Sequence, residues 1–183
     1  MTFRPGASIV AGMALLAMLL FAIPPTFATP SDTLQYRVRA AFLFNFSRFT
    51  DWPREHLEAR SHFDFCVIGD PDLAAATELS VRGKVMHGRP ARVSLPASSA
   101  AAGSCDLLYL AEPLEEWTAA VAGRPVLLVG EGRDFARRIG AVGFVLADNR
   151  LRFAINPSAA QGAGLQISSR LLELADIVSP DAD

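Results

Sequence analysis

YRVRAAFLFNFSRFTDWP, from Tyr36 to Pro53, is the stretch that decides the fold of this chain of 183 residues. Its apolar side chains recur at the three-to-four-residue spacing of one helical face. That face comprises Val38, Phe42, Asn45/Phe46 and Phe49, and it is widened by Ala41, Leu43 and Phe44. Residues 31–33 supply N-cap candidates, and Trp52-Pro53 should end the helix because the residue before a proline leaves the α region. So wide a stripe must be covered on more than one side, either as a core helix or as an oligomer or partner face.

Short apolar runs alternate with helical segments after this helix. We expect strands over 63–68, 106–110 and 126–129, and a bent strand or hairpin over 85–86 and 91–95. Helices are expected over 73–79, capped by Asp70 or Asp72, and over 114–121 and 134–139. Residues 96–104 fit either a loop or a weak helix. Fully apolar strands that alternate with helices predict a mainly parallel sheet with helices on both faces.

The end of the chain predicts an antiparallel addition to this sheet. Residues 142–146 and 151–155 flank Asp148-Asn149, which tolerates positive φ, so they form a C-terminal β-hairpin. Asn156-Pro157 is typical of a helix start, and 168–178 is expected to be the last helix. Its apolar face would comprise Leu171, Leu172, Ala175 and Val178. The predicted fold class is therefore α/β, with a mixed, mainly parallel central sheet.

The first 28 residues are typical of a signal peptide. Arg4 precedes an apolar run over 7–23, and 26–28 places small residues at the −3 and −1 positions of a cleavage site. The run is short for a membrane span of about 20 apolar residues, although a retained N-terminal anchor is the alternative. We therefore expect one exported domain over 29–183, with its core at about 34–178. In a bacterium, the protein would be periplasmic.

The expected export determines how we interpret the two cysteines, Cys66 and Cys105. In an oxidising compartment we predict that they form a disulfide, the alternative being two buried free thiols. Because Cα atoms more than about 7 Å apart cannot be bridged, a disulfide would make the strands at 63–68 and 106–110 neighbours. The local strand order would then be 2-1-3, as in flavodoxin-like sheets.

We find no arrangement of residues in the sequence that is typical of catalysis, and we expect no enzyme activity, cofactor or metal site. The glycines of 130–132 follow a strand but lack the third glycine of a dinucleotide loop, so we interpret them as a tight turn. His56, His62 and His87 lie far apart in the sequence and are interpreted as surface or loop residues. A net charge of −2 without a Lys/Arg run excludes a nucleic-acid footprint.

Three arginines stand within otherwise apolar stretches. Such a charge either reaches water along its own side chain or lines a cleft or an interface. With three of their neighbours they are the candidate residues for binding a partner or a ligand. The candidates are Arg48, Phe49, Trp52, Arg152, Asn156 and Arg170.

Residues 40–53 resemble the opening of the YfiR family, whose members carry the pattern Ala-Ala-x-Leu-x-Asn-Phe-x-(Arg/Lys)-Phe-x-x-Trp-Pro. Further matches follow in order over nearly all of the remaining chain. They are FCVIGD at 65–70, GKxxxGRP at 83–90, CDLLYL at 105–110, PVLLVG at 125–130, NRLRFxIN at 149–156 and AAxxAGLxISSRLL at 159–172.

The resemblance implies a periplasmic regulator with a mixed α/β sheet flanked by helices. By that resemblance the protein binds the periplasmic sensor domain of a YfiN-like membrane diguanylate cyclase and represses cyclic-di-GMP synthesis, and with it biofilm formation. A YfiB-like outer-membrane lipoprotein would sequester it, and a homodimer is implied. The family also places a cysteine pair where Cys66 and Cys105 stand, whereas the second pair that some members carry near the hairpin is missing here. The alternative function is a periplasmic small-ligand-binding sensor module of another signalling system.

Overall fold

The structure, a computed structural model, describes residues 30–148 and 150–180, so the predicted signal peptide lies outside the described residues. Its centre is an eight-stranded sheet with the order β10-β8-β7-β6-β5-β2-β4-β3. The strands are β2 (Phe63–Ile68), β3 (Val85–Met86), β4 (Arg89–Ser94), β5 (Leu107–Leu110), β6 (Leu127–Glu131), β7 (Val142–Ala147), β8 (Arg150–Ile155) and β10 (Asp176–Ile177). Strands β4, β2, β5, β6 and β7 are parallel, whereas β3 and β8 run antiparallel to β4 and β7.

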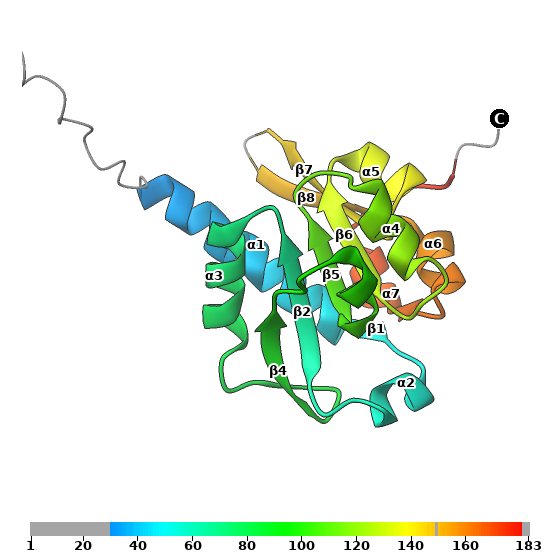
Figure 1. The fold of residues 1–183 in the computed structure, drawn as a ribbon. Helices are drawn as coiled ribbons and strands as arrows, with labels where there is room; N and C mark the ends of the chain where they lie inside the picture. Colours follow the sequence, from blue (N-terminus) through cyan, green and yellow to red (C-terminus); the bar gives the residue numbers. More distant parts are fainter. Residues whose placement is uncertain (1–29, 149, 181–183) are drawn as a thin grey trace, which may run out of the picture.

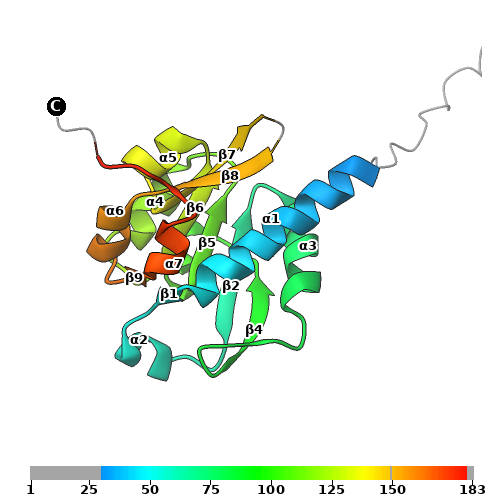
Figure 2. The same cartoon turned by 180° about the vertical axis from the view of Figure 1, so that it is seen from behind.

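Helices cover both faces of this sheet (Figures 1 and 2). One face carries α1 (Pro30–Arg48) and α3 (Pro71–Val81); the other carries the 3₁₀ helix η1 (Ser99–Ser104), α4 (Glu115–Val121) and α5 (Arg133–Arg138). The shorter helices are α2 (Arg54–Glu58), α6 (Pro157–Gly162) and α7 (Ser169–Leu172). The predicted mixed α/β class and the β7–β8 hairpin are confirmed, and η1 occupies the stretch for which both a loop and a helix were open.

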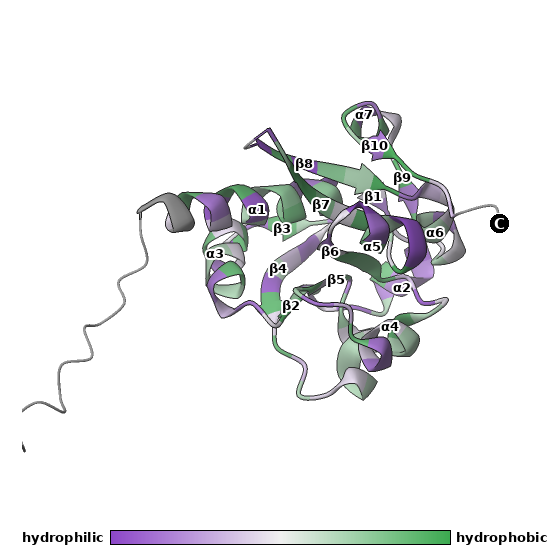
Figure 3. Ribbon diagram, turned by 90° about the horizontal axis from the view of Figure 1, so that it is seen from above, coloured by the Kyte–Doolittle hydropathy of each residue, from purple (hydrophilic) through white to green (hydrophobic). Residues whose placement is uncertain are grey.

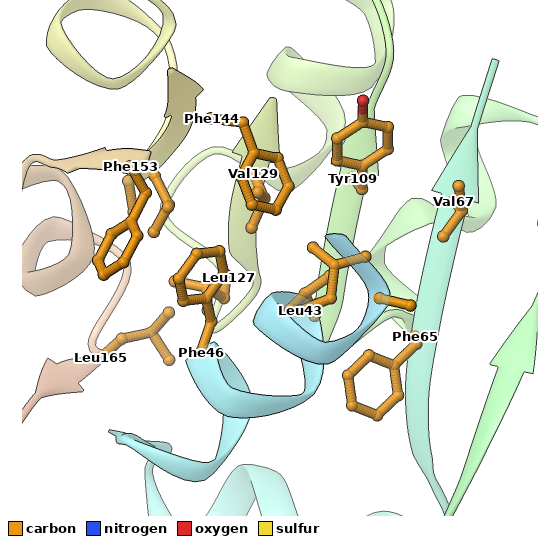
Figure 4. Close-up of a cluster of buried hydrophobic side chains, with 14 of the residues drawn as sticks. Leu43, Phe46, Phe65, Val67, Tyr109, Leu127, Val129, Phe144, Phe153 and Leu165 are labelled. Carbon is orange, nitrogen blue, oxygen red and sulfur yellow. The ribbon is translucent and has the colours of Figure 1, made fainter. Parts of the chain in front are cut away.

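The central strands are apolar on both sides, as expected of parallel strands between two helical layers. In β5, Leu107 and Tyr109 belong to the core under α1, whereas Leu108 and Leu110 belong to the core under α4. Figure 4 shows the first of these cores, in which side chains of α1 meet those of β2, β5 and β6. Figure 3 colours the ribbon by hydropathy: the central strands are largely green, that is hydrophobic, whereas helix α5 is largely purple, that is hydrophilic.

Helix α1 crosses the sheet and ends at Arg48, so the prediction that it continues to Trp52-Pro53 is wrong. The residues beyond it form strand β1 (Thr50–Asp51), which pairs antiparallel with β9 (Gln166–Ile167). The described helix also begins at Pro30, so residues 31–33 lie within its first turn and not before it. Backbone pairing with a segment more than 100 residues away decided the C-terminal end of the helix.

The predicted disulfide and the strand order that follows from it are both confirmed. Cys66 and Cys105 are bonded, with their Cα atoms 5.8 Å apart. Strand β2 pairs in parallel with β4 on one side and with β5 on the other. In chain order the parallel strands therefore run 2-1-3, as in a flavodoxin-like sheet.

The last predicted helix, 168–178, is wrong over most of its length. Helix α7 stops at Leu172, and Asp176–Ile177 forms the edge strand β10, parallel to β8. The backbone N–H of Val178 donates to the carbonyl of Ile155, 2.9 Å away. The spacing of apolar residues in this segment predicts a helix, but its backbone pairs with the free edge of β8 and forms a strand.

Local signals predicted the helix starts and one turn correctly. Asp70 caps α3 by accepting from the N–H of Leu73, and Asn156 caps α6 in the same way. Residues 130–132 form a strand-to-helix turn, in which a Cβ on Gly130 would lie 2.4 Å from the ring of Phe135. A side chain at Gly130 would collide with that ring, so the glycine is required for packing.

Candidate interaction surface

The β1–β9 ribbon brings two of the candidate arginines to one side of the molecule. Arg48 and Phe49 lie at the end of α1, and the carbonyl of Phe49 accepts from the N–H of Ser168, 2.8 Å away. Arg170 follows in α7, and both arginines are exposed. The Arg48 guanidinium lies 5.6 Å from the centre of the Phe49 ring, a cation–π distance. Figure 2 shows β1, β9 and α7 gathered at this end of α1. We call these residues and the ribbon the β1–β9 surface.

This ribbon also holds two buried hydroxyl groups that lack a hydrogen-bond partner among the described residues. They are Thr50 Oγ1 and Ser168 Oγ, one at each side of the ribbon. Buried polar groups are nearly always paired in folded proteins, because an unpaired one costs about 1–3 kcal/mol. The β1–β9 surface is thus a place where the described chain does not satisfy its own polar groups.

Trp52 and Asn156, two further candidates, lie inside the fold. Trp52 is 6% exposed, packs edge-on against Phe63 and donates through Nε1 to the carbonyl of Pro125, 2.9 Å away. Asn156 is 3% exposed; besides capping α6 it donates from Nδ2 to the carbonyl of Arg137. Their polar atoms bond within the chain and fix the ends of β1 and β8.

Arg152 lies on the other face of the sheet from α1. In β8, Phe153 belongs to the core under α1, whereas Ala154 belongs to a small core with Ala136 of α5. Since side chains alternate along a strand, exposed Arg152 points to the α5 side. The structure therefore gathers Arg48, Phe49 and Arg170 but separates Arg152 from them.

The outward side of α1 is an uncovered stripe of Leu34, Val38, Ala41 and Asn45. Leu34 is 60% exposed and Val38 39% exposed, and Ala41 is exposed as well. The opposite side of the same helix is fully buried, with Ala40, Leu43 and Phe46 at 0% exposure. The sequence pattern predicts cover on more than one side of this helix. The sheet and α3 cover one side, and no element of the described chain covers the outer stripe.

A buried polar cluster lies beneath the disulfide, at the amino-terminal edge of the sheet. Asp106 is fully buried; its Oδ2 accepts from the N–H of Asp64, and its Oδ1 lies 2.7 Å from His56 Nε2. Burial raises the pKa of Asp106, and the hydrogen bonds from Asp64 and His56 and the charge of Arg60 oppose the rise. His56 is therefore bound within the fold, and its interpretation as a surface or loop residue is wrong.

Asp64, the second buried carboxylate of this cluster, is held by β4. It accepts two hydrogen bonds from the Arg92 guanidinium, at 2.6 and 3.3 Å, and one from the Ser94 hydroxyl. The bond to Asp64 raises the pKa of Arg92. Acidic residues within or directly before apolar strands must find partners, and this signal in the sequence could have predicted the cluster.

His87 lies in the turn between β3 and β4, so the predicted loop position is confirmed, and its side chain packs into the fold. Its Nε2 lies 2.9 Å from the carbonyl of Ser47, and its ring packs against Trp52 and Phe63. A positive φ of 48° at His87, followed by Gly88, turns β3 into β4. The histidine therefore ties this hairpin to the end of α1.

A second polar cluster occupies the carboxyl edge of the parallel strands. The Tyr109 hydroxyl donates to Glu131 Oε1 at 2.5 Å, and Arg39 donates to the same oxygen at 2.6 Å. Burial raises the pKa of Tyr109, and the neighbouring Glu131 raises it further. The hydroxyl therefore stays protonated and acts as a donor. A cavity of about 130 Å³ lies beside it, lined by Gln35, Tyr36, Arg39 and Asp70.

No helix in residues 30–148 and 150–180 is both long and apolar enough to span a membrane. The same residues contain no group of three or more His, Cys, Asp or Glu side chains placed to hold a metal ion.

Comparison with known proteins identifies one family. The family profile described as YfiR/HmsC-like matches residues 36–176, from the first turns of α1 to the start of β10. No curated protein matches the chain at a significant level. YfiR-like proteins are periplasmic and regulatory, and they act in cyclic-di-GMP signalling. The match covers more than half of the chain and extends from α1 to the first residue of the edge strand β10, so the chain belongs to the YfiR/HmsC-like family.

Proposed function

We propose that this protein binds the periplasmic sensor domain of a YfiN-like membrane diguanylate cyclase and holds the cyclase inactive. It would thereby lower cyclic-di-GMP and repress biofilm formation. Membership of the YfiR/HmsC-like family supports a regulatory role in this signalling system. A YfiB-like outer-membrane lipoprotein that competes for the regulator would restore cyclic-di-GMP synthesis.

The observation that carries this proposal at the level of residues is the β1–β9 surface. It combines an aromatic side chain, Phe49, with the exposed charges of Arg48 and Arg170. Aromatic residues and arginine are enriched where proteins contact one another. The hydroxyls of Thr50 and Ser168 are buried within the same ribbon and have no hydrogen-bond partner among the described residues, so they fill no contact of their own inside the domain. Trp52 and Asn156 are buried, so they would not contact the partner; they would hold the β1–β9 surface in position.

Repression would work by linkage. If the regulator binds the inactive conformation of the sensor domain more tightly than the active one, it shifts the population toward the inactive state. The shift cannot exceed the difference between the two affinities, so a hundredfold change in the ratio needs about 2.7 kcal/mol. No reactive group of the regulator is required for this effect.

The first experiment deletes the gene and measures cyclic-di-GMP. Deletion should raise cyclic-di-GMP and biofilm, and re-expression of the wild-type protein should reverse both. The double variant R48E/R170E should fail to reverse them and should bind the purified sensor domain at least tenfold more weakly, a loss of about 1.4 kcal/mol. Unchanged cyclic-di-GMP after deletion would count against the proposal.

Charge-reversal variants elsewhere supply the controls. Arg82 is exposed just after α3, away from the β1–β9 ribbon, and Arg82→Glu should repress like wild type. Arg152→Glu tests whether the interface also reaches the α5 side of the sheet. Circular dichroism and the melting temperature should match wild type for all these variants, because the substituted side chains are exposed.

The small-ligand sensor remains a second candidate, on the strength of the cavity beside Tyr109. That cavity lies at the carboxyl edge of the sheet and is lined by Asp70, two residues after the end of β2, and by Arg39 of α1. In open α/β sheets, ligands bind outside the carboxyl ends of the strands where the strand order reverses. Thermal-shift measurements with amino acids and other small zwitterions would raise the melting temperature if this site is used.

A further inference from the structure

We propose that the outer edge of β4 is a docking site for an extended peptide segment of a partner protein, which pairs with β4 as an added strand. Strand β3 pairs with β4 only at Arg89 and Pro90. The N–H of Ala91 makes one further bond, to the carbonyl of Lys84, 2.9 Å away. Beyond Ala91, no described strand pairs with this side of β4 (Figure 1), so the end of β4 forms an edge of the sheet.

This edge offers a backbone donor and an acceptor at Val93. Along a strand, the N–H and C=O groups of successive residues point to opposite sides. Ala91 directs its N–H to β3, so Arg92 directs its backbone groups to β2 and Val93 directs its own outward. A row of outward backbone groups is a template for β-strand addition, in which an extended peptide pairs with the edge.

A cavity of about 580 Å³ lies against this edge, on the α3 side of the sheet. The side chains that line it from α3 and from the end of β4 include Ala74, Ala75, Val93 and Leu95. Val93 packs against the core under α1 and α3, whereas Arg92 points to the opposite face and holds Asp64 there. Because side chains alternate along a strand, a strand added beside β4 would direct every second side chain over this cavity.

The lining of the cavity selects an apolar segment that also carries a cation. Leu95 is 72% exposed and Ala75 is exposed as well, so apolar surface is open to water at this edge. Asp70 and Glu78 contribute two carboxylates, and none of the described residues that line the cavity is Lys or Arg. An added strand with apolar side chains on this face would cover Leu95, and a Lys or Arg on the same face would meet the carboxylates.

The edge lacks the usual protection against pairing. Natural proteins blunt an exposed strand edge with charged residues, prolines or bulges. Here Pro90 and Pro96 stand on either side of the open part, and the one charge between them belongs to Arg92. That charge is held by Asp64, through bonds of 2.6 and 3.3 Å. The backbone between the two prolines therefore admits a short strand of about five residues. The inference does not depend on the cyclase partner, because the β1–β9 surface contributes nothing to this edge.

A peptide titration of the purified, ¹⁵N-labelled mature protein tests the edge. The probe is an acetylated and amidated peptide, Val-Thr-Val-Thr-Lys, which places both valines and the lysine on one face of a strand. The amide signals of Val93 and Leu95 should shift and saturate at a peptide concentration below about 1 mM. The control peptide Val-Pro-Val-Pro-Lys keeps that face but lacks two backbone N–H groups, so it should produce no such shift.

Two variants of the protein test the two halves of the site. Ala75→Arg fills the cavity with a cation and should weaken binding of the first peptide at least about tenfold. The matched control is Leu79→Arg, since Leu79 is 66% exposed on the same helix and does not line the cavity. Val93→Pro removes the outward N–H and should also weaken binding at least about tenfold. Circular dichroism should match wild type for all three variants, because an edge strand tolerates proline where its N–H faces solvent.

Three outcomes would overturn the proposal. The first is that the Val93 and Leu95 amides do not shift with the peptide at about 1 mM. The second is that Ala75→Arg binds the peptide as tightly as wild type. The third is that the same amides shift with protein concentration alone, which would show that a second copy of the chain covers this edge.

Discussion

Asp106 and Asp64 are carboxylates buried at the amino-terminal edge of an otherwise apolar sheet. Burial of a charge is costly unless hydrogen bonds and opposite charges compensate it. Both residues have such partners: His56 and a backbone N–H for Asp106, and Arg92 with Ser94 for Asp64. The cluster therefore ties α2 and three strands together below the disulfide.

The pKa of Asp106 leads to a prediction about stability and pH. Its pKa is raised in the folded state by burial, so the folded protein binds this proton more tightly than the unfolded chain. The cost of ionising Asp106 is absent below the unfolded pKa of about 3.9 and develops as the pH rises through the higher folded pKa. Asp106→Asn removes this titration, so the stability of the variant relative to wild type should rise as the pH increases above the unfolded pKa of about 3.9.

Urea unfolding at a series of pH values measures this difference. Glu112→Gln, which neutralises an exposed carboxylate, serves as the control and should parallel wild type throughout. A constant difference in unfolding free energy between Asp106→Asn and wild type would show that burial does not control this carboxyl group.

At the scale of elements, α1 has two apolar sides with different roles. Its inner side packs on the sheet through Leu43 and Phe46, and the ring of Phe46 contacts the rings of Phe144 and Phe153. Its outer side faces away from the domain. The same chemical change on the two sides should therefore have different effects on stability.

Leu43→Ala should lower the free energy of unfolding by about 2–5 kcal/mol, because it leaves a cavity in a fully buried site. Leu34→Ala, on the outer side of the same helix, should change it by less than about 0.5 kcal/mol, because Leu34 is exposed. Chemical denaturation compares the two variants. Equal losses would contradict the assignment of the two sides.

At the scale of the whole molecule, the disulfide joins the strands that flank the point where the sheet order reverses. Cys66 and Cys105 are separated by 39 residues, and both are fully buried. The loop that they close contains α3, β3, β4 and η1. The bond therefore restrains about a quarter of the described chain in the unfolded state.

Replacing both cysteines by alanine should lower the free energy of unfolding by about 4 kcal/mol in the chain-entropy model. The variant should still fold and keep its strand order, because the sheet itself pairs β2 with β5. Denaturation of the variant and of wild type without reductant measures the loss. A difference below about 1 kcal/mol would indicate that the unfolded chain gains little freedom when the bond is removed.

Much of this fold follows from the sequence alone, because the relevant signals are local. Apolar runs bounded by turns predicted β2, β5, β6 and the β7–β8 hairpin. Asp70 and Asn156 predicted the starts of the helices that they cap, α3 and α6. Cys66 and Cys105 predicted the neighbouring strands, since a disulfide limits how far apart two Cα atoms can lie. The sequence also required cover on more than one side of α1.

Tertiary structure decided the features that depend on partners distant in the chain. Helix α1 ends at Arg48 because Thr50 and Asp51 pair with β9, and the predicted last helix became β10 because β8 offered a free edge. The His56–Asp106 pair and the grouping of Arg48 with Arg170 arise in the same way. Helical spacing reports only on neighbours within a few residues, whereas strand pairing and buried ion pairs join residues that the sequence keeps far apart.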